Sequence, residues 1–354
     1  MKLFKYPILV FDNIIKQLDP IPLVSLSFCS KKTKERIKWV SFAIERAWFG
    51  NKSIKQRGYY FAVKFPSQQI LYVIFESYSS NFKKYLKNFS VRIGDLFYDL
   101  RHSEKRNSIY MGCIGYKKAS LFFNYILGLV RAGINEIEID LNRLNNTKLF
   151  LSEPCFKNVQ KIRLDGKAVS SKQVDKFYDC FEKPVLQTCV TSYIRSLSRT
   201  SKLLQSENLF MYKVTYISIG HLLNFSGKYI SVRLSSLLEE HIISFVKHWL
   251  DGNYPNLKGA YISCRMESTF EPSKVLDEFN TKRWNPAERA QNFIFKGLFG
   301  GGEQSEFSLK DCSNGMIWNE EMAYWQQCNS KNMINALVSL NDASSSTNLL
   351  LSFR

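Results

Sequence analysis

Residues that could perform chemistry are few in this sequence, which contains four histidines, eight cysteines and one run of glycines. His241 and His248 stand seven positions apart in a segment predicted to be helical, so they share a face but lie two turns apart, too far to hold one metal ion together. Gly300 to Gly302 could approach a phosphate, but no Lys-Ser or Lys-Thr pair follows, and Glu303 carries the wrong charge. We therefore expect no metal site and no cofactor.

Carboxylates and nucleophiles give no clearer signal of catalysis. Glu239-Glu240 and Glu320-Glu321 stand at predicted helix starts, where negative charge complements the helix dipole. No serine lies in a recognisable nucleophile elbow, and the cysteines form no C-x-x-C pair and no Cys/His signature. The sequence does not favour an enzyme.

The same cysteines bear on the cellular compartment. Scattered thiols without a pairing pattern are typical of reduced intracellular proteins. The N-terminal apolar run stops at Asp12, too short for a signal-peptide core. The longest other apolar stretch, Leu121 to Val130, is about half of the ~20 residues that cross a bilayer. We expect a cytoplasmic or nuclear protein with no membrane partner.

Positive charge is concentrated near the N-terminus. The chain has 354 residues with 49 Lys and Arg against 31 Asp and Glu, and residues 1–110 alone contain 20 against 8. Such an excess predicts an acidic partner, which is nucleic acid, an anionic membrane or an acidic protein surface.

A basic cluster within this region keeps nucleic acid open as an alternative function. Its residues are Lys31, Lys32, Lys34, Arg36 and Lys38. No helix-turn-helix glycine, zinc spacing or aromatic RNA-binding text accompanies it, so a solvated helix face or the rim of a protein interface is the favoured interpretation.

Three short helices are predicted in the first fifty residues. Apolar residues at helical spacing predict a helix from Ile8 to Leu18, which the Asp19-Pro20 pair ends. A second short helix follows, with Pro22 in its first turn, and a third is predicted from Ser30 to Trp48. A module this small has no deep core, so we expect a partner to cover part of its apolar surface.

Strands are predicted after Gly50. Tyr59 to Phe65 and Ile70 to Phe75 are rich in aromatic and β-branched residues and predict a hairpin. A third strand is predicted from Val91 to Leu100. Further on, helices are predicted at 119–131, 171–181 (with Ser171 as its cap) and 239–250, and strands at 136–141, 159–164, 214–219, 229–234 and 257–263.

The later strands suggest a repeat. Ile137, Ile162, Ile217 and Ile262 occupy matching places in four of them, at separations of 25, 55 and 45 positions. This resembles an irregular leucine-rich repeat of ~20–29 residues, although the strict L-x-x-L-x-L text is missing. An ordinary α/β domain, in which helices and strands alternate anyway, is the other interpretation.

The first segment resembles an F-box. From Tyr6 to Lys38 it has an x-Pro opening, an apolar helix, a Leu-Asp-Pro break, a Leu-x-x-Leu step and the text Cys-Ser-Lys-Lys-Thr-Lys. The usual Leu-Pro opening is replaced by Tyr6-Pro7. The match covers about a tenth of the chain.

The remainder is similar to F-box proteins with a type 2 F-box-associated domain. The text from Phe245 to Ser263 carries this similarity: a helix ending in Trp-Leu, a Gly-Asn-x-Pro-Asn-Leu turn and a strand. An Asp-x-Arg-Arg-x-Asp-Gly-like text, usual downstream in that family, is replaced here by Phe307 to Met322, so no residues are carried over from it.

The resemblance implies the substrate receptor of a Skp–cullin–F-box type ubiquitin ligase. The F-box would dock on an acidic Skp-type adaptor and through it on a cullin, while the C-terminal region would bind a target protein that the sequence does not identify. Such a receptor supplies proximity and no catalytic group. By motif position, the residues expected to form or support the adaptor-binding face are Pro7, Ile8, Leu9, Ile14, Leu18, Pro20, Leu23, Leu26 and Ser30.

The predicted fold class is therefore α+β or α/β, with an N-terminal three-helix F-box followed by an irregular leucine-rich-repeat-like α/β domain. The predicted divisions are the F-box at 1–50, a β-rich connecting segment at 51–110, the F-box-associated domain at 111–340 and a mobile, serine-rich tail at 341–354.

Overall fold

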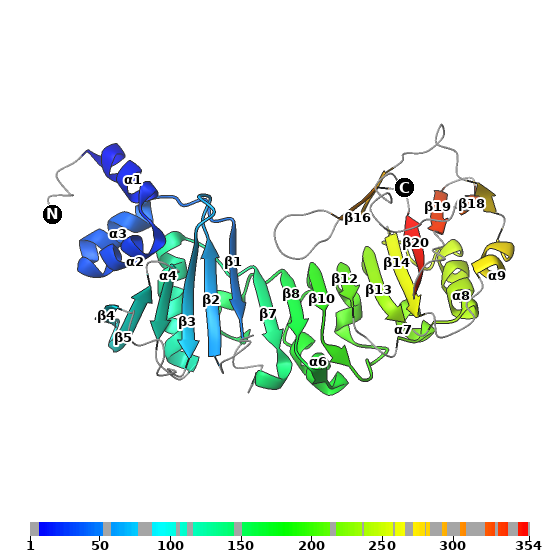
Figure 1. Cartoon of the computed structure of the whole chain (residues 1–354), viewed down its shortest axis with the longest axis horizontal. Helices are drawn as coiled ribbons and strands as arrows, with labels where there is room; N and C mark the ends of the chain where they lie inside the picture. Colours follow the sequence, from blue (N-terminus) through cyan, green and yellow to red (C-terminus); the bar gives the residue numbers. More distant parts are fainter. Residues whose placement is uncertain are drawn as a thin grey trace. The chain divides into compact units, whose positions relative to one another are not determined.

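The computed structural model divides the chain into two compact units, Met1–Ile162 (unit 1) and Arg163–Arg354 (unit 2) (Figure 1). The fold is α+β, as the sequence predicts, with three N-terminal helices before a mixed, sheet-rich domain. The residues that the structure describes are 7–51, 58–76, 87–103, 107–111, 116–144, 151–212, 217–235, 237–257, 259–265, 272–279, 281–283, 292–295, 305–308, 323–329, 332–338 and 346–352.

Unit 1 opens with the three predicted helices. They are α1 (Ile8–Gln17), α2 (Pro20–Cys29) and α3 (Lys31–Trp39). Asp19 is extended before Pro20, as the residue before a proline usually is, and this separates α1 from α2. Ser30 caps α3, because its hydroxyl accepts a hydrogen bond from the backbone N–H of Thr33 at 3.0 Å. The starts of all three helices are close to those predicted.

The predicted end of the third helix at Trp48 is wrong. α3 ends at Trp39, and residues Arg46–Gly50 form strand β1 instead. β1 pairs antiparallel with β2 (Gly58–Lys64) and parallel with β7 (Glu136–Asp140). Pairing with strands distant in the sequence overrides the helical spacing of its apolar residues, as often happens for aromatic segments at the centre of a sheet.

The sheet of unit 1 has the order β7-β1-β2-β3-β6-β5-β4. Its other strands are β3 (Ile70–Glu76), β4 (Lys87–Ile93), β5 (Leu96–Ser103) and β6 (Ser108–Met111). β2 and β3 form the predicted antiparallel hairpin. The single strand predicted at 91–100 is wrong, because β4 and β5 are two antiparallel strands joined at a tight turn. Gly94 lies in that turn at a φ of 59°, a conformation that favours glycine.

Helix α4 (Tyr116–Val130) covers one face of this sheet. Phe123 lies among three aromatic rings of β1, β2 and β3, with ring centroids 6.1 Å from Phe49, 4.7 Å from Phe61 and 4.7 Å from Phe75. All four side chains are buried. This aromatic cluster is the centre of the core of unit 1.

The three N-terminal helices are joined to this core through α4. Phe28 of α2 stacks on Tyr125 of α4 with ring centroids 5.2 Å apart, and the hydroxyls of Ser27 and Tyr125 are hydrogen bonded at 2.9 Å. The predicted boundaries at residues 50 and 110 therefore fall within one compact unit, in which β1 and the strands that follow share a sheet.

Unit 2, which begins within β8 (Lys161–Asp165), contains a series of parallel strands with helices between them (Figure 1). Strand order here is β8-β10-β12-β13-β14, and β10, β12, β13 and β14 are parallel neighbours. The bounds are β10 (Gln187–Val190), β12 (Asn208–Met211), β13 (Tyr229–Ser235) and β14 (Gly259–Arg265), and the short strands β9 (Ala168–Val169) and β11 (Tyr193–Ile194) form a separate pair.

The strand register reveals a repeat that differs from the predicted one. Val190, Met211, Val232 and Ile262 are successive partners across β10, β12, β13 and β14. The first two steps are 21 residues each, within the leucine-rich-repeat range, and the third is 30. Ile217, which the sequence placed in a strand at 214–219, lies two residues before α7, which begins at Ile219, so Ile217 is not a strand residue; residues 214–216 lie outside the described residues. The true repeat positions are occupied by Val and Met as well as Ile, which hid the regular step.

The α-helices that the structure describes in unit 2 alternate in sequence with these strands or follow them. They are α6 (Ser171–Tyr178), α7 (Ile219–Leu223), α8 (Glu239–Leu250) and α9 (Pro272–Asp277). The cap of α6 is Ser170, not Ser171 as predicted, because Ser170 and Gln173 exchange the two hydrogen bonds of a capping box. A buried hydrogen bond between the hydroxyls of Tyr178 and Thr188, at 3.0 Å, joins α6 to β10, and a second, between the hydroxyls of Thr188 and Ser206 at 2.8 Å, joins β10 to the segment before β12.

The last described strands of unit 2 are antiparallel. β20 (Ser346–Ser352) pairs with β14 and with β19 (Asn332–Val338), which pairs with β18 (Ala323–Asn329), and β15 (Thr281–Arg283) follows at the edge. β16 (Asn292–Phe295) and β17 (Ser305–Ser308) form a separate hairpin. Within the predicted tail at 341–354, residues Ser346–Ser352 form β20, whose apolar run Leu349 to Leu351 continues the sheet; residues 341–345 and 353–354 lie outside the described residues.

Candidate interaction surface

The first turn of α1 exposes a group of apolar side chains. Ile8 is 52% exposed, Leu9 73% and Val10 41%, and Pro7 before them is exposed as well. Phe11, in the next turn, is buried and holds α1 against the module. Four neighbouring apolar residues facing solvent are unusual in a small helix and are typical of a surface that a partner covers.

The remaining residues of the predicted adaptor-binding set are divided between surface and interior. Ile14, Leu18 and Leu26 are half-buried, whereas Pro20 and Leu23 are buried. Ser30 is exposed and caps α3. The structure thus brings Pro7, Ile8 and Leu9 together on the surface, and it gives Pro20, Leu23 and Ser30 positions that support the helices.

Two exposed apolar residues were missed by sequence reasoning. Val10 belongs neither to the motif positions nor to the helical series of apolar residues from Ile8 to Leu18. Trp39 is 72% exposed in the last turn of α3, and the prediction of a longer helix assigned the aromatic role to Trp48. The sequence does contain a sign of this surface, because Trp39 directly follows the lysine-rich segment and exposed tryptophans are frequent anchors of protein interfaces.

The basic cluster of α3 is partly engaged within unit 1. The ammonium group of Lys34 lies 4.4 Å from the ring centroid of Tyr125, and its burial there lowers the pKa of Lys34. The guanidinium of Arg36 lies 5.5 Å from the ring centroid of Phe11, and Lys38 forms an ion pair with Glu35 at 3.1 Å. At least three of the five cationic side chains therefore have intramolecular roles, which weakens the interpretation of this helix as a nucleic-acid interface.

The side chains considered for catalysis or metal binding have structural contacts. The Nδ1 atom of His241 accepts a hydrogen bond from the backbone N–H of Leu238 at 3.0 Å, and the ring of His248 packs edge-on against Tyr254 at 5.0 Å. No group of three or more His, Cys, Asp or Glu side chains suited to a metal ion occurs among the described residues. Residues 300–302 and 320–321 lie outside the described residues.

The helices of the described segments bear on whether the chain could span a membrane. None of them is both long enough and apolar enough to cross a bilayer.

Comparison with known protein families agrees with this architecture. Residues 7–45 match the family model of the F-box domain, and residues 200–262 match the model described as F-box associated. The first match contains α1, α2 and α3 and stops just before β1, and the second extends from the segment before β12 into β14. No curated protein and no solved structure matches the chain.

These matches confirm the resemblance seen in the sequence. An F-box together with an F-box-associated domain supports a general substrate-adaptor role in ubiquitin ligases of the Skp–cullin–F-box type, and F-box domains typically bind a Skp adaptor. The chain carries an F-box domain at residues 7–45 and an F-box-associated domain at residues 200–262.

Proposed function

We propose that this chain is the substrate-recognition subunit of a Skp–cullin–F-box type ubiquitin ligase. The F-box binds the Skp-type adaptor, which connects the chain to a cullin, and the C-terminal domain binds the target protein. The observation that carries the proposal is the exposed apolar first turn of α1, formed by Pro7, Ile8, Leu9 and Val10 within the matched F-box.

The free energy available at this turn supports an interface. Fully burying one Leu or Ile side chain contributes about 1.5–3 kcal/mol. Leu9 is 73% exposed and Ile8 is 52% exposed, so more than half of the free energy of burying each side chain is still available on binding a partner. The basic excess of residues 1–110 adds electrostatic attraction to an acidic adaptor, which mainly raises the association rate.

In this proposal the chain has no catalytic group of its own. It raises the rate of ubiquitin transfer by holding the target close to the transferase, since proximity replaces a bimolecular encounter with an effectively unimolecular one. The structural roles of His241 and His248 are consistent with a binding protein rather than an enzyme.

The test is copurification of the full chain with a purified Skp-type adaptor. We expect Pro7→Ala combined with Leu9→Ala to weaken adaptor binding by roughly tenfold or more, because about 1.4 kcal/mol of lost burial corresponds to a factor of ten. Phe97→Ala is the matched control, since Phe97 is a similarly exposed apolar residue of unit 1, at 69%, outside the F-box. Equal adaptor binding by the double variant and the control would refute the proposed docking surface.

A further inference from the structure

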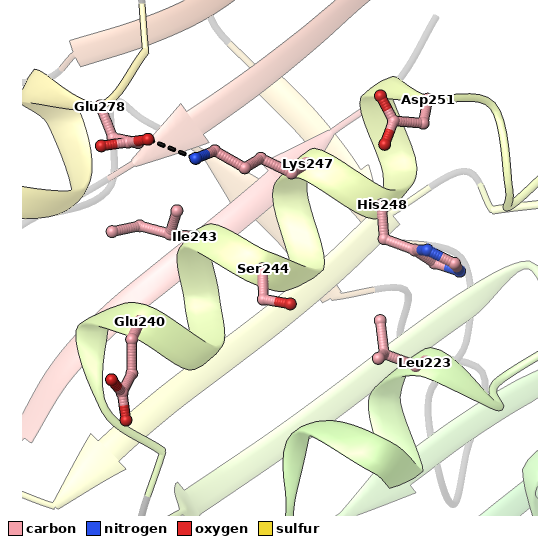
Figure 2. Close-up of a pocket in the computed structure, with 8 residues that line it drawn as sticks. All are labelled: Leu223, Glu240, Ile243, Ser244, Lys247, His248, Asp251 and Glu278. Atoms are coloured by element: carbon pink, nitrogen blue, oxygen red, sulfur yellow. Dashed lines mark hydrogen bonds and ion pairs between the residues drawn. The ribbon is translucent and has the colours of Figure 1, made fainter.

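A groove of about 420 Å³ follows the exposed face of α8 in unit 2 (Figure 2). α8 forms its length, with Glu240 near one end and Asp251 at the other, and Leu223 of α7 and Glu278 after α9 line its sides. Ile243 and Leu223 give the lining an apolar component. We call this feature the α8 groove.

The charges that line the α8 groove are mostly negative. It has three carboxylates, on Glu240, Asp251 and Glu278, against one lysine. That lysine, Lys247, is already paired with Glu278, as the dashed line in Figure 2 marks. Asp251 forms no ion pair with another described residue. Glu240 lies 3.9 Å from the Nε2 atom of His241, and no lysine or arginine that lines the groove is left to pair with Glu240 or Asp251.

The position of Asp251 strengthens this point. It is the C-cap of α8, and its backbone N–H donates to the carbonyl of Lys247 at 2.9 Å. A helix C-terminus carries partial negative charge, so a carboxylate there is unfavourable by itself. A cation from another molecule, placed at this end of the groove, would relieve the repulsion.

The negative charge of the α8 groove contrasts with the net positive charge of the whole chain. The chain has a formal net charge of +18, so a cationic ligand is repelled by the molecule as a whole and is attracted only where carboxylates gather. Glu240 and Asp251 are eleven positions apart, which is about 16 Å along a helix and about five residues of extended peptide.

From these observations we infer that the α8 groove binds a cationic peptide segment of the target protein. Two basic side chains lie at Glu240 and Asp251, and an apolar side chain between them contacts Leu223 and Ile243. This inference deepens the proposed function and rests on it, since it gives the substrate-binding domain a site and a ligand class.

The first experiment is selection of a random heptapeptide phage library on the immobilised full chain. A basic protein without a specific site enriches acidic peptides. We expect instead enrichment of peptides with two Lys or Arg residues separated by a short spacer that contains an apolar residue. Enrichment of acidic or uncharged peptides would overturn the inference.

The second experiment measures the affinity of the most enriched synthetic peptide by fluorescence anisotropy. Glu240→Gln combined with Asp251→Asn should weaken binding roughly three- to thirtyfold. Asp179→Asn combined with Glu182→Gln is the matched control, because it removes the same charge from exposed positions of unit 2 and also includes a helix C-cap, that of α6. Equal affinities of the two double variants would overturn the inference.

Two further measurements separate the possible explanations. If light scattering finds a wild-type dimer that the Glu240→Gln/Asp251→Asn variant lacks, the occupant is a second copy of this chain and the target-segment inference fails. Adaptor copurification should be unchanged in the same variant. If the wild-type chain does not bind the adaptor but still selects basic peptides, the proposed ligase role is refuted and the α8 groove remains a cationic-peptide site.

Discussion

Tyr125 of α4 is the residue on which the attachment of the F-box helices to unit 1 most depends. Its ring stacks on Phe28 at a centroid distance of 5.2 Å and an interplanar angle of 12°. Its hydroxyl is hydrogen bonded to Ser27, and the ammonium group of Lys34 lies 4.4 Å from the ring centroid. Tyr125→Ala removes all three contacts at once.

The expected cost follows from these contacts. The aromatic pair contributes about 0.5–1.5 kcal/mol, the hydrogen bond about 0.5–1.5 kcal/mol and the cation–π contact about 0.5–1 kcal/mol. Tyr125→Ala should therefore reduce the free energy of opening of α2 and α3 by about 1.5–4 kcal/mol. Tyr125→Phe keeps the stack and should cost only about 1 kcal/mol.

Native-state hydrogen exchange with mass spectrometry measures this directly, since it reports the opening of individual segments. Amides of α2 and α3 should lose protection in Tyr125→Ala, while amides of α8 in unit 2 keep theirs and act as an internal control. The control is Tyr193→Ala, at a tyrosine of unit 2 that is 39% exposed. It should leave the free energy of opening of α2 and α3 within about 0.5 kcal/mol of the wild-type value. Unchanged protection of α2 and α3 in Tyr125→Ala would refute the attachment.

Two other predictions test the interior of each unit. Burial raises the pKa of the Cys155 thiol to about 12, with a smaller contribution from Glu153, so almost no Cys155 thiolate forms at pH 8. Iodoacetamide should therefore modify the exposed Cys29 at pH 8, whereas Cys155 should react only after denaturation or near pH 12. Labelling of both cysteines at pH 8 in the native protein would contradict the burial of Cys155. Gly227→Ala should lower the free energy of unfolding in urea by about 1–3 kcal/mol, because an added Cβ would lie 2.1 Å from the carbonyl oxygen of Ser206. The control is Gly128→Ala in α4, where nothing lies within 4 Å of an added Cβ, and it should be neutral or stabilising. Equal urea midpoints of the two variants would contradict the close packing around Gly227.

Local sequence patterns predicted the elements whose stability is local. α1 and α2 follow from apolar spacing and from the proline breaks, and the start of α3 follows from its Ser30 cap. The β2–β3 hairpin follows from two aromatic runs around a turn. In each case the deciding interactions lie within a few residues of one another, so the sequence alone contains the information.

The errors occur where distant pairing decides. Trp48 continues the helical spacing of Ile37, Val40 and Ile44, but Arg46–Gly50 forms a strand that pairs with β7, far along the chain. The repeat in unit 2 could not be aligned from isoleucines alone, because Val190, Met211 and Val232 fill equivalent positions of the parallel sheet.

The candidate surfaces show the same division. The F-box motif identified Pro7, Ile8 and Leu9 by position, but the exposure of Trp39 depends on where α3 ends. The α8 groove combines residues of α7, α8 and the end of α9, and no single motif records that arrangement.

The most direct measurement of the central claim is size-exclusion chromatography with light scattering of the full chain, a Skp-type adaptor and a cullin N-terminal domain, mixed in equal amounts. The proposed function predicts a single 1:1:1 complex that forms only when the adaptor is present and that Pro7→Ala with Leu9→Ala disrupts. A chain that elutes alone in the presence of both proteins, or that binds the cullin without the adaptor, would contradict it.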